Sequence, residues 1–184
     1  NVVITTDSSE ASLSTEATEE ITTEPQTEAQ SEFDFIKTIE STYICGRKLS
    51  YPMTWGQFDE GFTIDNTDPY IVKKKKKIVA TVKYKGYEIG DFIFNKCISI
   101  DDITENTIIS SLTIKNFDNS DVPDITVNDL RFGDNHKQLF EALDSNYKEG
   151  VGYNQIIYKN DIGLYRFTFN EEDSLITVGL NVIE

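Results

Sequence analysis

The sequence has few of the residues on which metal and cofactor chemistry depends. Its 184 residues include two cysteines, one histidine, one methionine and one tryptophan. Two cysteines and one histidine cannot supply the four ligands of a structural Cys/His zinc site. The chain also has no run of about 18 apolar residues, so it predicts no membrane-spanning helix. We therefore expect no bound metal and no cofactor.

The first 32 residues lack lysine, arginine and every aromatic side chain. They hold eight carboxylates and are otherwise rich in Thr, Ser and Ala. Such a segment cannot bury enough apolar surface to offset the entropy lost on ordering, so residues 1–32 are predicted to be a disordered acidic tether. Residues 33–184 contain every Phe, Tyr and Trp and are predicted to form a single globular domain.

Basic residues are scarce throughout. The chain has 17 Lys and Arg against 32 Asp and Glu, a formal net charge of −15. Nucleic-acid binding needs a basic face that replaces counterions, so we expect no nucleic-acid partner. The exception is a run of five lysines: Lys73, Lys74, Lys75, Lys76 and Lys77. We interpret the run as a solvated edge that discourages strand pairing, with a contact for an anionic partner as the functional alternative.

Residue patterns predict a repeated order of short helix and three strands. The expected strands are Ile78–Tyr84, Tyr87–Asn95, Thr107–Ile114, Gln155–Lys159, Leu164–Phe169 and Leu175–Val182. A capping box at Thr54 predicts a helix to Glu60, and Asp134 is the expected cap of a helix to Leu143. We predict an α+β fold in which two repeats, about residues 49–116 and 125–184, join their antiparallel sheets with both helices on one face.

Short motifs resemble those of small exported bacterial domains. They are Leu130–Asp134 ahead of a helix, and the hairpin segment Tyr165–Asp173. Domains with such motifs include the small lipoprotein of the outer-membrane barrel-assembly machine and the tandem β-lactamase-inhibitor-protein-like fold. The segment Gly46–Thr54 is similar to a motif of lipoproteins from gut Firmicutes. The resemblance implies a non-catalytic, surface-tethered binding module and transfers no ligand.

The chain begins with Asn1 rather than Met. We interpret it as the product of an exported bacterial protein, with a removed signal segment or a lipid-bearing cysteine just upstream; the alternative is a cytosolic protein with an ordinary disordered start. We expect an extracytoplasmic location, anchored at the cell surface. In such a protein Cys45 and Cys97 can form a disulfide, and the alternative is two buried free thiols.

Candidate catalytic groups are isolated in the sequence. His136 lies in the first turn of a predicted helix, and no nucleophile motif surrounds it, so we interpret it as a surface or partly packed histidine. The acidic groups Asp101–Asp102 and Glu171–Asp173 lie in predicted turns and are expected to be solvated rather than a glycosidase pair. The loop Asp118–Asp124 lacks the spacing of a calcium-binding loop. We predict no catalytic residue and no metal ligand.

The aromatic cluster around Pro52 is predicted to belong mostly to the core. Its members are Tyr51, Met53, Trp55 and Phe58. The alternative is an aromatic surface for carbohydrate or peptide.

Strand alternation predicts a sheet with one buried and one wet face. On the wet face it places Thr81, Lys83, Arg166, Thr168 and Thr177. We predict a monomeric, non-enzymatic binding module whose partner is a protein or a cell-envelope polymer and which meets the membrane only through an upstream lipid anchor. The alternatives are a cell-wall or glycan-acting enzyme, which needs two facing carboxylates in a deep pocket, and a structural spacer, which has no concave surface.

Overall fold

The computed structural model describes residues 33–116, 124–143, 148–149 and 154–183. Within them the chain forms two antiparallel sheets, two α-helices and three short 3₁₀ segments. None of the described helices is both long and apolar enough to cross a membrane. The predicted tether, residues 1–32, lies outside the described residues, as does most of the candidate calcium loop (117–123).

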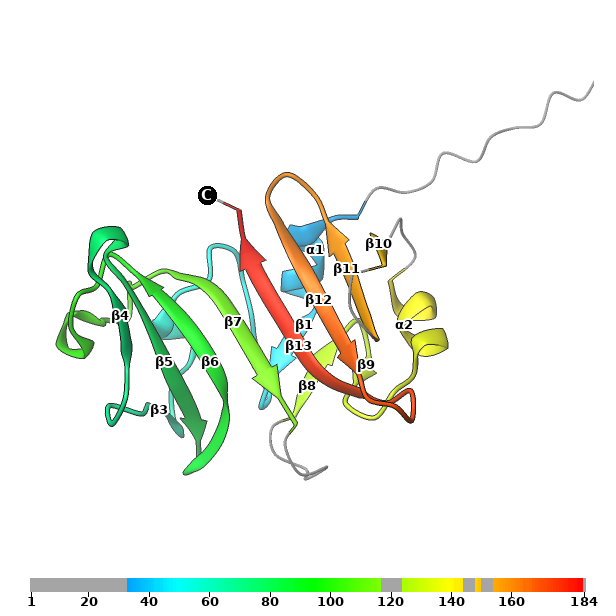
Figure 1. The fold of residues 1–184 in the computed structure, drawn as a ribbon, viewed down its shortest axis with the longest axis horizontal. Helices are drawn as coiled ribbons and strands as arrows, with labels where there is room; N and C mark the ends of the chain where they lie inside the picture. The colour runs from blue at the N-terminus through cyan, green and yellow to red at the C-terminus, as the bar shows by residue number, and fades with distance from the viewer. Residues whose placement is uncertain (1–32, 117–123, 144–147, 150–153, 184) are drawn as a thin grey trace, which may run out of the picture.

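The larger sheet forms a continuous layer across the molecule (Figure 1). Its nine strands are β3 (Phe62–Ile64), β4 (Tyr70–Val72), β5 (Lys77–Tyr84), β6 (Tyr87–Asn95), β7 (Ile109–Lys115), β10 (Lys148–Glu149), β11 (Gln155–Lys159), β12 (Gly163–Phe169) and β13 (Leu175–Val182). Their order is β10-β11-β12-β13-β7-β6-β5-β3, and β4 pairs with β5 as well. Two consecutive three-stranded meanders therefore meet at the β7–β13 pair.

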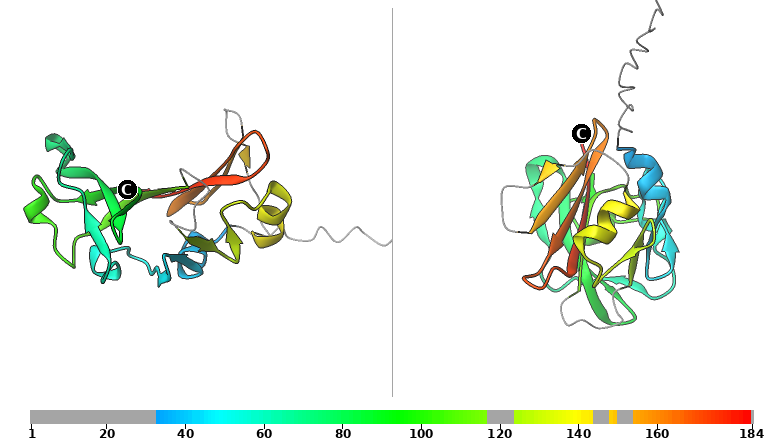
Figure 2. Two further views of the ribbon diagram at one scale, coloured as in Figure 1. Left: turned by 90° about the horizontal axis from the view of Figure 1, so that it is seen from below. Right: turned by 90° about the vertical axis from the view of Figure 1, so that its right-hand side faces the viewer.

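A small sheet and the two α-helices form a second layer (Figure 2). The small sheet has the order β2-β1-β8-β9. Its strands are β1 (Thr42–Ile44), β2 (Arg47–Lys48), β8 (Ile125–Val127) and β9 (Leu130–Arg131), and the helical segments are α1 (Phe35–Glu40), α2 (His136–Ala142), η1 (Trp55–Gln57), η2 (Lys73–Lys75) and η3 (Ile100–Asp102). Seen from below, α1, α2 and the small sheet all lie on the same side of the large sheet (Figure 2). In that view neither α-helix and no strand of the small sheet lies on the opposite side of β7, β13 and β12.

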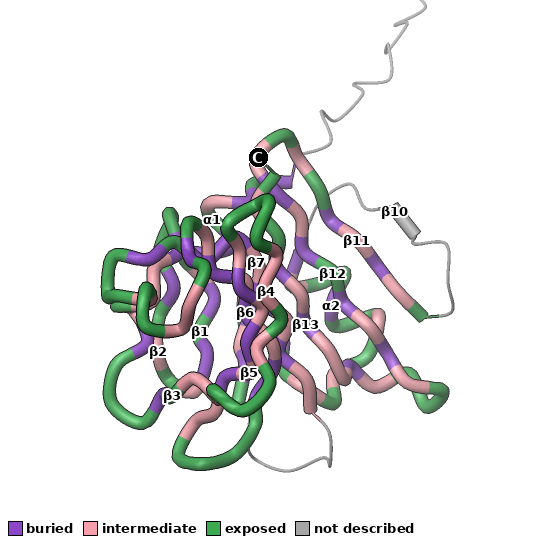
Figure 3. Tube along the Cα trace, turned by 60° about the vertical axis from the view of Figure 1, so that its left-hand side comes forward, coloured by how far each residue is buried: buried purple, intermediate pink, exposed green. Residues whose placement is uncertain are grey.

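Burial alternates along the strands of the large sheet, as Figure 3 shows. On β12, Tyr165 and Phe167 are fully buried, whereas Arg166 between them is exposed. On β5, Ile78 and Val82 are fully buried. Burial of apolar area stabilises by about 25 cal/mol per Å². The sheet is therefore anchored through one face, which packs on the second layer, while the other face carries the polar residues.

Helix α1 packs against the large sheet through the ring of Phe35, which fills the space that a side chain at Gly163 would occupy. Asp34 caps the helix by accepting a hydrogen bond from the Lys37 amide at 3.0 Å. The next residue, Phe35, is fully buried and meets the Tyr165 ring edge-on, with centroids 5.6 Å apart. A Cβ at Gly163 would overlap the Phe35 ring. Glycine is required on β12 because the ring fills that space.

A buried hydroxyl chain links the helix to both sheets. The Thr42 hydroxyl donates to the Thr38 carbonyl at 2.7 Å. Since its one hydrogen is used there, it accepts the Tyr165 hydroxyl, 2.8 Å away. Burial raises the pKa of Tyr165 well above its usual range, so this hydroxyl remains a donor. The chain joins α1, β1 and β12.

The predicted α+β fold with two repeats was wrong. The described chain is mostly antiparallel sheet. Its small sheet combines β8 and β9, which the repeat hypothesis assigned to the second unit, with β1 and β2, which it assigned to neither. The helix expected from Thr54 to Glu60 is only the short segment η1, and the Thr54 side chain does not cap it. The Gln57 side chain bonds instead to Ser50 and to the Pro52 carbonyl. With its capping partner engaged elsewhere, the helix does not extend.

The strand predictions of both meanders were confirmed. For example, the predicted Gln155–Lys159 and Leu175–Val182 agree with β11 and β13. The predicted cap of α2 was wrong, because Asn135 caps the helix by accepting from the Gln138 amide at 3.1 Å. Asp134 accepts from the Arg131 amide instead, at 2.7 Å. A short polar side chain stands at both positions, and backbone geometry decides between them.

We predict that Gly163→Ala lowers the free energy of unfolding by about 1–3 kcal/mol, because the new methyl group overlaps Phe35. Gly179→Ala on the adjacent strand is the control, since a Cβ there lies 3.7 Å from Thr113 Oγ1 and 3.8 Å from Arg166 Cβ, ordinary contacts. Urea unfolding of the two variants measures the difference. Equal losses would contradict the proposed seat of α1.

Candidate functional site

The exposed side of the large sheet is the candidate site, and we call it the open face. It consists of the outward-pointing residues of β5, β6, β7, β13, β12 and β11. Directly opposed residues of antiparallel strands lie on the same face. One row of opposed residues crosses the open face through Thr81, Asp91, Thr113, Gly179 and Arg166.

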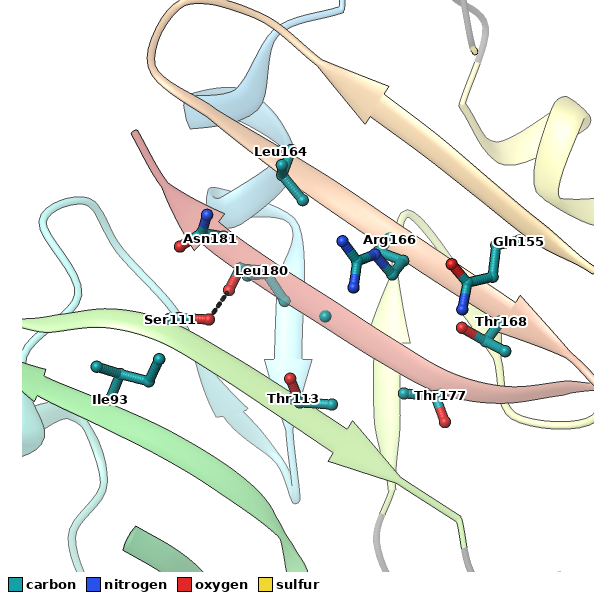
Figure 4. A pocket seen from close by; sticks show the side chains of 11 residues that line it. Ile93, Ser111, Thr113, Gln155, Leu164, Arg166, Thr168, Thr177, Leu180 and Asn181 are labelled. Atoms are coloured by element: carbon teal, nitrogen blue, oxygen red, sulfur yellow. Dashed lines mark hydrogen bonds between the residues drawn. The ribbon is translucent and has the colours of Figure 1, made fainter. Parts of the chain in front are cut away.

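A depression of about 520 Å³ lies on the open face over β7, β13 and β12 (Figure 4). Most of its side chains are polar and uncharged. Its hydroxyl groups belong to Ser111, Thr113, Thr168 and Thr177, its side-chain amides to Gln155 and Asn181, and its branched apolar groups to Ile93 and Leu164. Arg166 is the ionisable residue of the lining. The depression thus offers hydrogen-bond donors and one fixed positive charge.

Arg166 is exposed and has no hydrogen bond or ion pair with any residue that the structure describes. Its side chain extends from β12 toward β13 (Figure 4). A guanidinium carries five N–H donors in a planar fork and stays charged at all physiological pH values. The donors of Arg166 are therefore available to an external ligand.

Gly179 forms the floor of the depression between Thr113 and Arg166, its two opposed residues. A Cβ at this position would make ordinary contacts, and the backbone is not left-handed there. Neither space nor conformation requires glycine, although glycine inside a strand costs about 0.5–1 kcal/mol relative to alanine. Its effect is to leave the floor open beside Arg166, as glycine often does where a ligand approaches a strand.

Cations are concentrated on the open face of this acidic protein. The outward positions of the six strands carry five of them: Lys77, Lys83, Lys115, Lys159 and Arg166. The carboxylates at outward positions are Asp91 and Glu88. Lys115 pairs with Asp91 at 2.8 Å, and the Thr81 hydroxyl donates to the same carboxylate at 3.1 Å. The carboxylate that lies nearest the depression in the central row is thus already neutralised.

Lys83 is engaged with a loop residue at the far side of the open face. Its ammonium lies 2.6 Å from an Asp65 oxygen. The hydrogen bond from Lys83, followed by those from Thr67, lowers the pKa of Asp65 from 3.8 to about 2. This pair fastens the loop after β3 to β5.

The five residues predicted for the wet face divide into two groups. Arg166, Thr168 and Thr177 line the depression together. Thr81 and Lys83 lie on β5 and are bound to Asp91 and Asp65. The alternation of β13 places Gly179 on the same face as Thr177, but Gly179 was not among the predicted site residues.

Neighbouring strands add four residues that sequence reasoning also missed. The alternation of β7 and β11 carried the signal for three of them, Ser111, Thr113 and Gln155, and that of β13 for Asn181.

The lysine run forms the connection between β4 and β5. Lys73–Lys75 make the segment η2, Lys76 is left-handed with φ of 49°, and Lys77 begins β5. Lys73 to Lys76 are exposed. The run is at an end of the sheet and does not line the depression.

His136 connects α2 to the β12–β13 turn. Its Nδ1 contacts the Asp173 carboxylate, and its ring stacks on Phe169 with centroids 3.8 Å apart. Within the described residues, no serine or cysteine side chain is hydrogen-bonded to its ring. The imidazole and carboxylate hold two elements together and lack the nucleophile of a triad.

Both cysteines are free thiols. Cys45 is half-buried in the β1–β2 turn, and Cys97 is buried, with its Sγ donating to the Asn95 carbonyl at 3.3 Å. Burial raises the pKa of both thiols, which disfavours the reactive thiolate. Within the described residues, no three His, Cys, Asp or Glu side chains gather where they could hold a metal ion.

Two further candidates have structural contacts. Asp102 accepts hydrogen bonds from the Ile98 and Ser99 amides at 2.8 and 2.9 Å and so shapes its own turn. Trp55 stacks on Phe58, with centroids 5.9 Å apart, at the edge of the core. From the aromatic cluster, Met53 and Phe58 are buried and Tyr51 is exposed.

We predict that Asp65→Asn is less stable than the wild type at neutral pH and that the difference disappears in acid. The folded pKa lies below the unfolded one, so ionised Asp65 stabilises fully above 3.8 and stops doing so as pH falls toward about 2. Urea unfolding across this range measures the difference. Asp68→Asn, an exposed carboxylate in the same loop, is the control. A pH-independent difference would contradict the ion pair.

Comparisons of the chain with protein-family models, with curated proteins and with solved structures found no match. What the open face does must therefore be inferred from its own residues. They combine a shallow hollow, an unpaired arginine, several hydroxyl groups and a glycine floor.

Proposed function

We propose that this chain is a non-catalytic binding module that holds a protein partner on the open face of its large sheet. The observation that carries the proposal is one-sided burial: one face is anchored by the core, and the other presents a polar hollow with a guanidinium that no described residue pairs. Antiparallel sheets with one covered face commonly use the other for contact with solvent or partners. The sheet supplies a rigid platform for recognition.

The chemistry of the hollow favours binding over hydrolysis. A glycan-acting enzyme needs two carboxyl groups on opposite sides of the scissile bond. The described residues that line the hollow carry hydroxyl, amide and apolar groups and the Arg166 guanidinium, and none of these described residues is a carboxylate. Asp91, the neighbouring carboxylate in the central row, is paired with Lys115. These groups can orient and hold a ligand, but they do not form a general acid and base pair.

The size of the open face suits a protein partner. Six strands span about five spacings of 4.8 Å, and their length of about seven residues corresponds to about 23 Å, which gives roughly 550 Å² before side-chain relief is counted. Standard protein interfaces bury about 800 Å² per partner and transient ones less than about 600 Å², so the open face has the size of a transient interface. A structural spacer does not need a binding surface, so it would not explain why cations outnumber carboxylates on the open face of a protein with a net charge of −15.

We place this module outside the cytoplasm, anchored at a bacterial cell surface. The Thr- and Glu-rich composition of residues 1–32 supports a tether that holds the domain away from the surface. The motifs at Leu130–Asp134 and Tyr165–Asp173, which resemble those of exported bacterial domains, support the same location.

A random peptide library displayed on phage and selected on the full chain tests the binding proposal. We expect selected peptides to bind the open face, so Thr113→Trp, which fills the hollow, should weaken their binding at least tenfold. Thr126→Trp is the matched control, because Thr126 is a half-exposed threonine of β8 in the small sheet. Circular dichroism checks that both variants fold.

Two outcomes would overturn the binding proposal. One is a library that yields no specific binder. The other is a set of binders that Thr113→Trp and Thr126→Trp affect equally.

A further inference from the structure

We infer that the open face recognises an acidic segment of its protein partner, with an Asp or Glu carboxylate held by Arg166 above Gly179. The inference rests on the proposed function and adds the chemistry of the partner. It follows from three features of the open face: an unpaired guanidinium, the gap beside it, and an apolar patch at a fixed distance.

The charge distribution selects an anionic ligand. The chain carries −15 overall, yet the outward positions of the open face carry five cations against two carboxylates, Asp91 and Glu88. Lys115 is paired with Asp91 and Lys83 with Asp65, whereas Arg166 has no ion pair with any described residue. A carboxylate matches the planar fork of an arginine in a bidentate pair. The Thr113, Thr168 and Thr177 hydroxyls line the same hollow and can donate to the oxygens that Arg166 leaves unsatisfied.

The glycine floor makes room for this carboxylate. Gly179 is directly opposed to Arg166 on one side and to Thr113 on the other. A side chain at position 179 would occupy the space between them, and the fold does not require its absence. An open floor lets the carboxylate lie against the sheet, where the guanidinium and the threonine hydroxyl flank it.

An apolar patch accompanies the cationic hollow. Tyr70, Val79 and Ile93 are opposed residues of β4, β5 and β6 on the open face, and Tyr70 is 69% exposed. Ile93 also lines the hollow. Exposed apolar groups beside a polar hollow are typical of protein contacts. A phosphate polymer or a lipid headgroup has no group for this patch, so the combination favours a protein segment.

The spacing of the two features defines the ligand more closely. Ile93 lies three strands from Arg166, about 14 Å at 4.8 Å per strand, and its row of opposed residues ends at Leu164, two residues or about 7 Å from Arg166. The two side chains are therefore about 16 Å apart, and since an extended peptide covers about 3.3 Å per residue, about five residues separate its acidic side chain from its apolar one. We expect the segment to cross the strands of the open face and not to add to their edge.

The selected peptides test this inference. We expect an Asp or Glu in them about five residues from an apolar residue. Arg166→Gln should weaken binding of a synthetic peptide about 10- to 100-fold, the range for a charge-assisted pair. Arg131→Gln is the matched control, since Arg131 is also exposed, has no described ion pair and changes the net charge equally. It should change affinity less than twofold in calorimetry.

Filling the floor provides a second variant. Gly179→Leu keeps the charge of Arg166 but occupies the space beside it, and we expect at least a tenfold loss of affinity. Exchange of the peptide's acidic residue for Gln should produce a similar loss in the wild type and almost none in Arg166→Gln. That non-additivity identifies the two groups as partners.

The outcomes separate this inference from the proposed function. Peptides that lose affinity with Thr113→Trp but carry no conserved acidic residue would overturn the inference and leave the binding face intact. Equal effects of Arg166→Gln and Arg131→Gln would also overturn it. They would show that the peptide responds to the net charge of the protein at long range and not to a contact with Arg166. Binders that ignore Thr113→Trp would overturn both proposals.

Discussion

The structure depends on the burial of one face of the large sheet by the second layer. Phe35 occupies the place of a side chain at Gly163, and the Tyr165 hydroxyl donates to Thr42, which in turn donates to Thr38. These contacts fix α1 and the small sheet on the same face of β12. Because the second layer lies on one side, the strands of the larger sheet keep a face that the described chain leaves uncovered.

The same strands therefore build the core and the candidate site. On β12, Tyr165 and Phe167 point into the core, while Arg166 and Thr168 point into the hollow. A binding group on a central strand is held by the packing beneath it and needs little reordering on binding. The glycines on these adjacent strands have different roles. Gly163 leaves space for the Phe35 ring, and in our proposal Gly179 leaves space for a ligand.

Local patterns were sufficient for some of these features and insufficient for others. Period-two alternation located the strands of both meanders and placed Arg166, Thr168 and Thr177 on the outward side. The predicted repeat fails because β1, β2, β8 and β9 form a separate sheet and the expected first helix is only η1, while Gln57 bonds to Ser50 and Pro52. The pairing of β1 with β8 joins residues about 80 positions apart, which local propensity does not encode.

The central claim is that recognition takes place on the open face of the large sheet. The most direct measurement is a nuclear magnetic resonance titration of the full chain with a selected peptide, following amide and side-chain signals. The account predicts shifts concentrated at Thr113, Arg166 and Gly179, with Thr126 of the small sheet unchanged. Shifts concentrated on the small sheet or on α2, with the hollow unaffected, would contradict it.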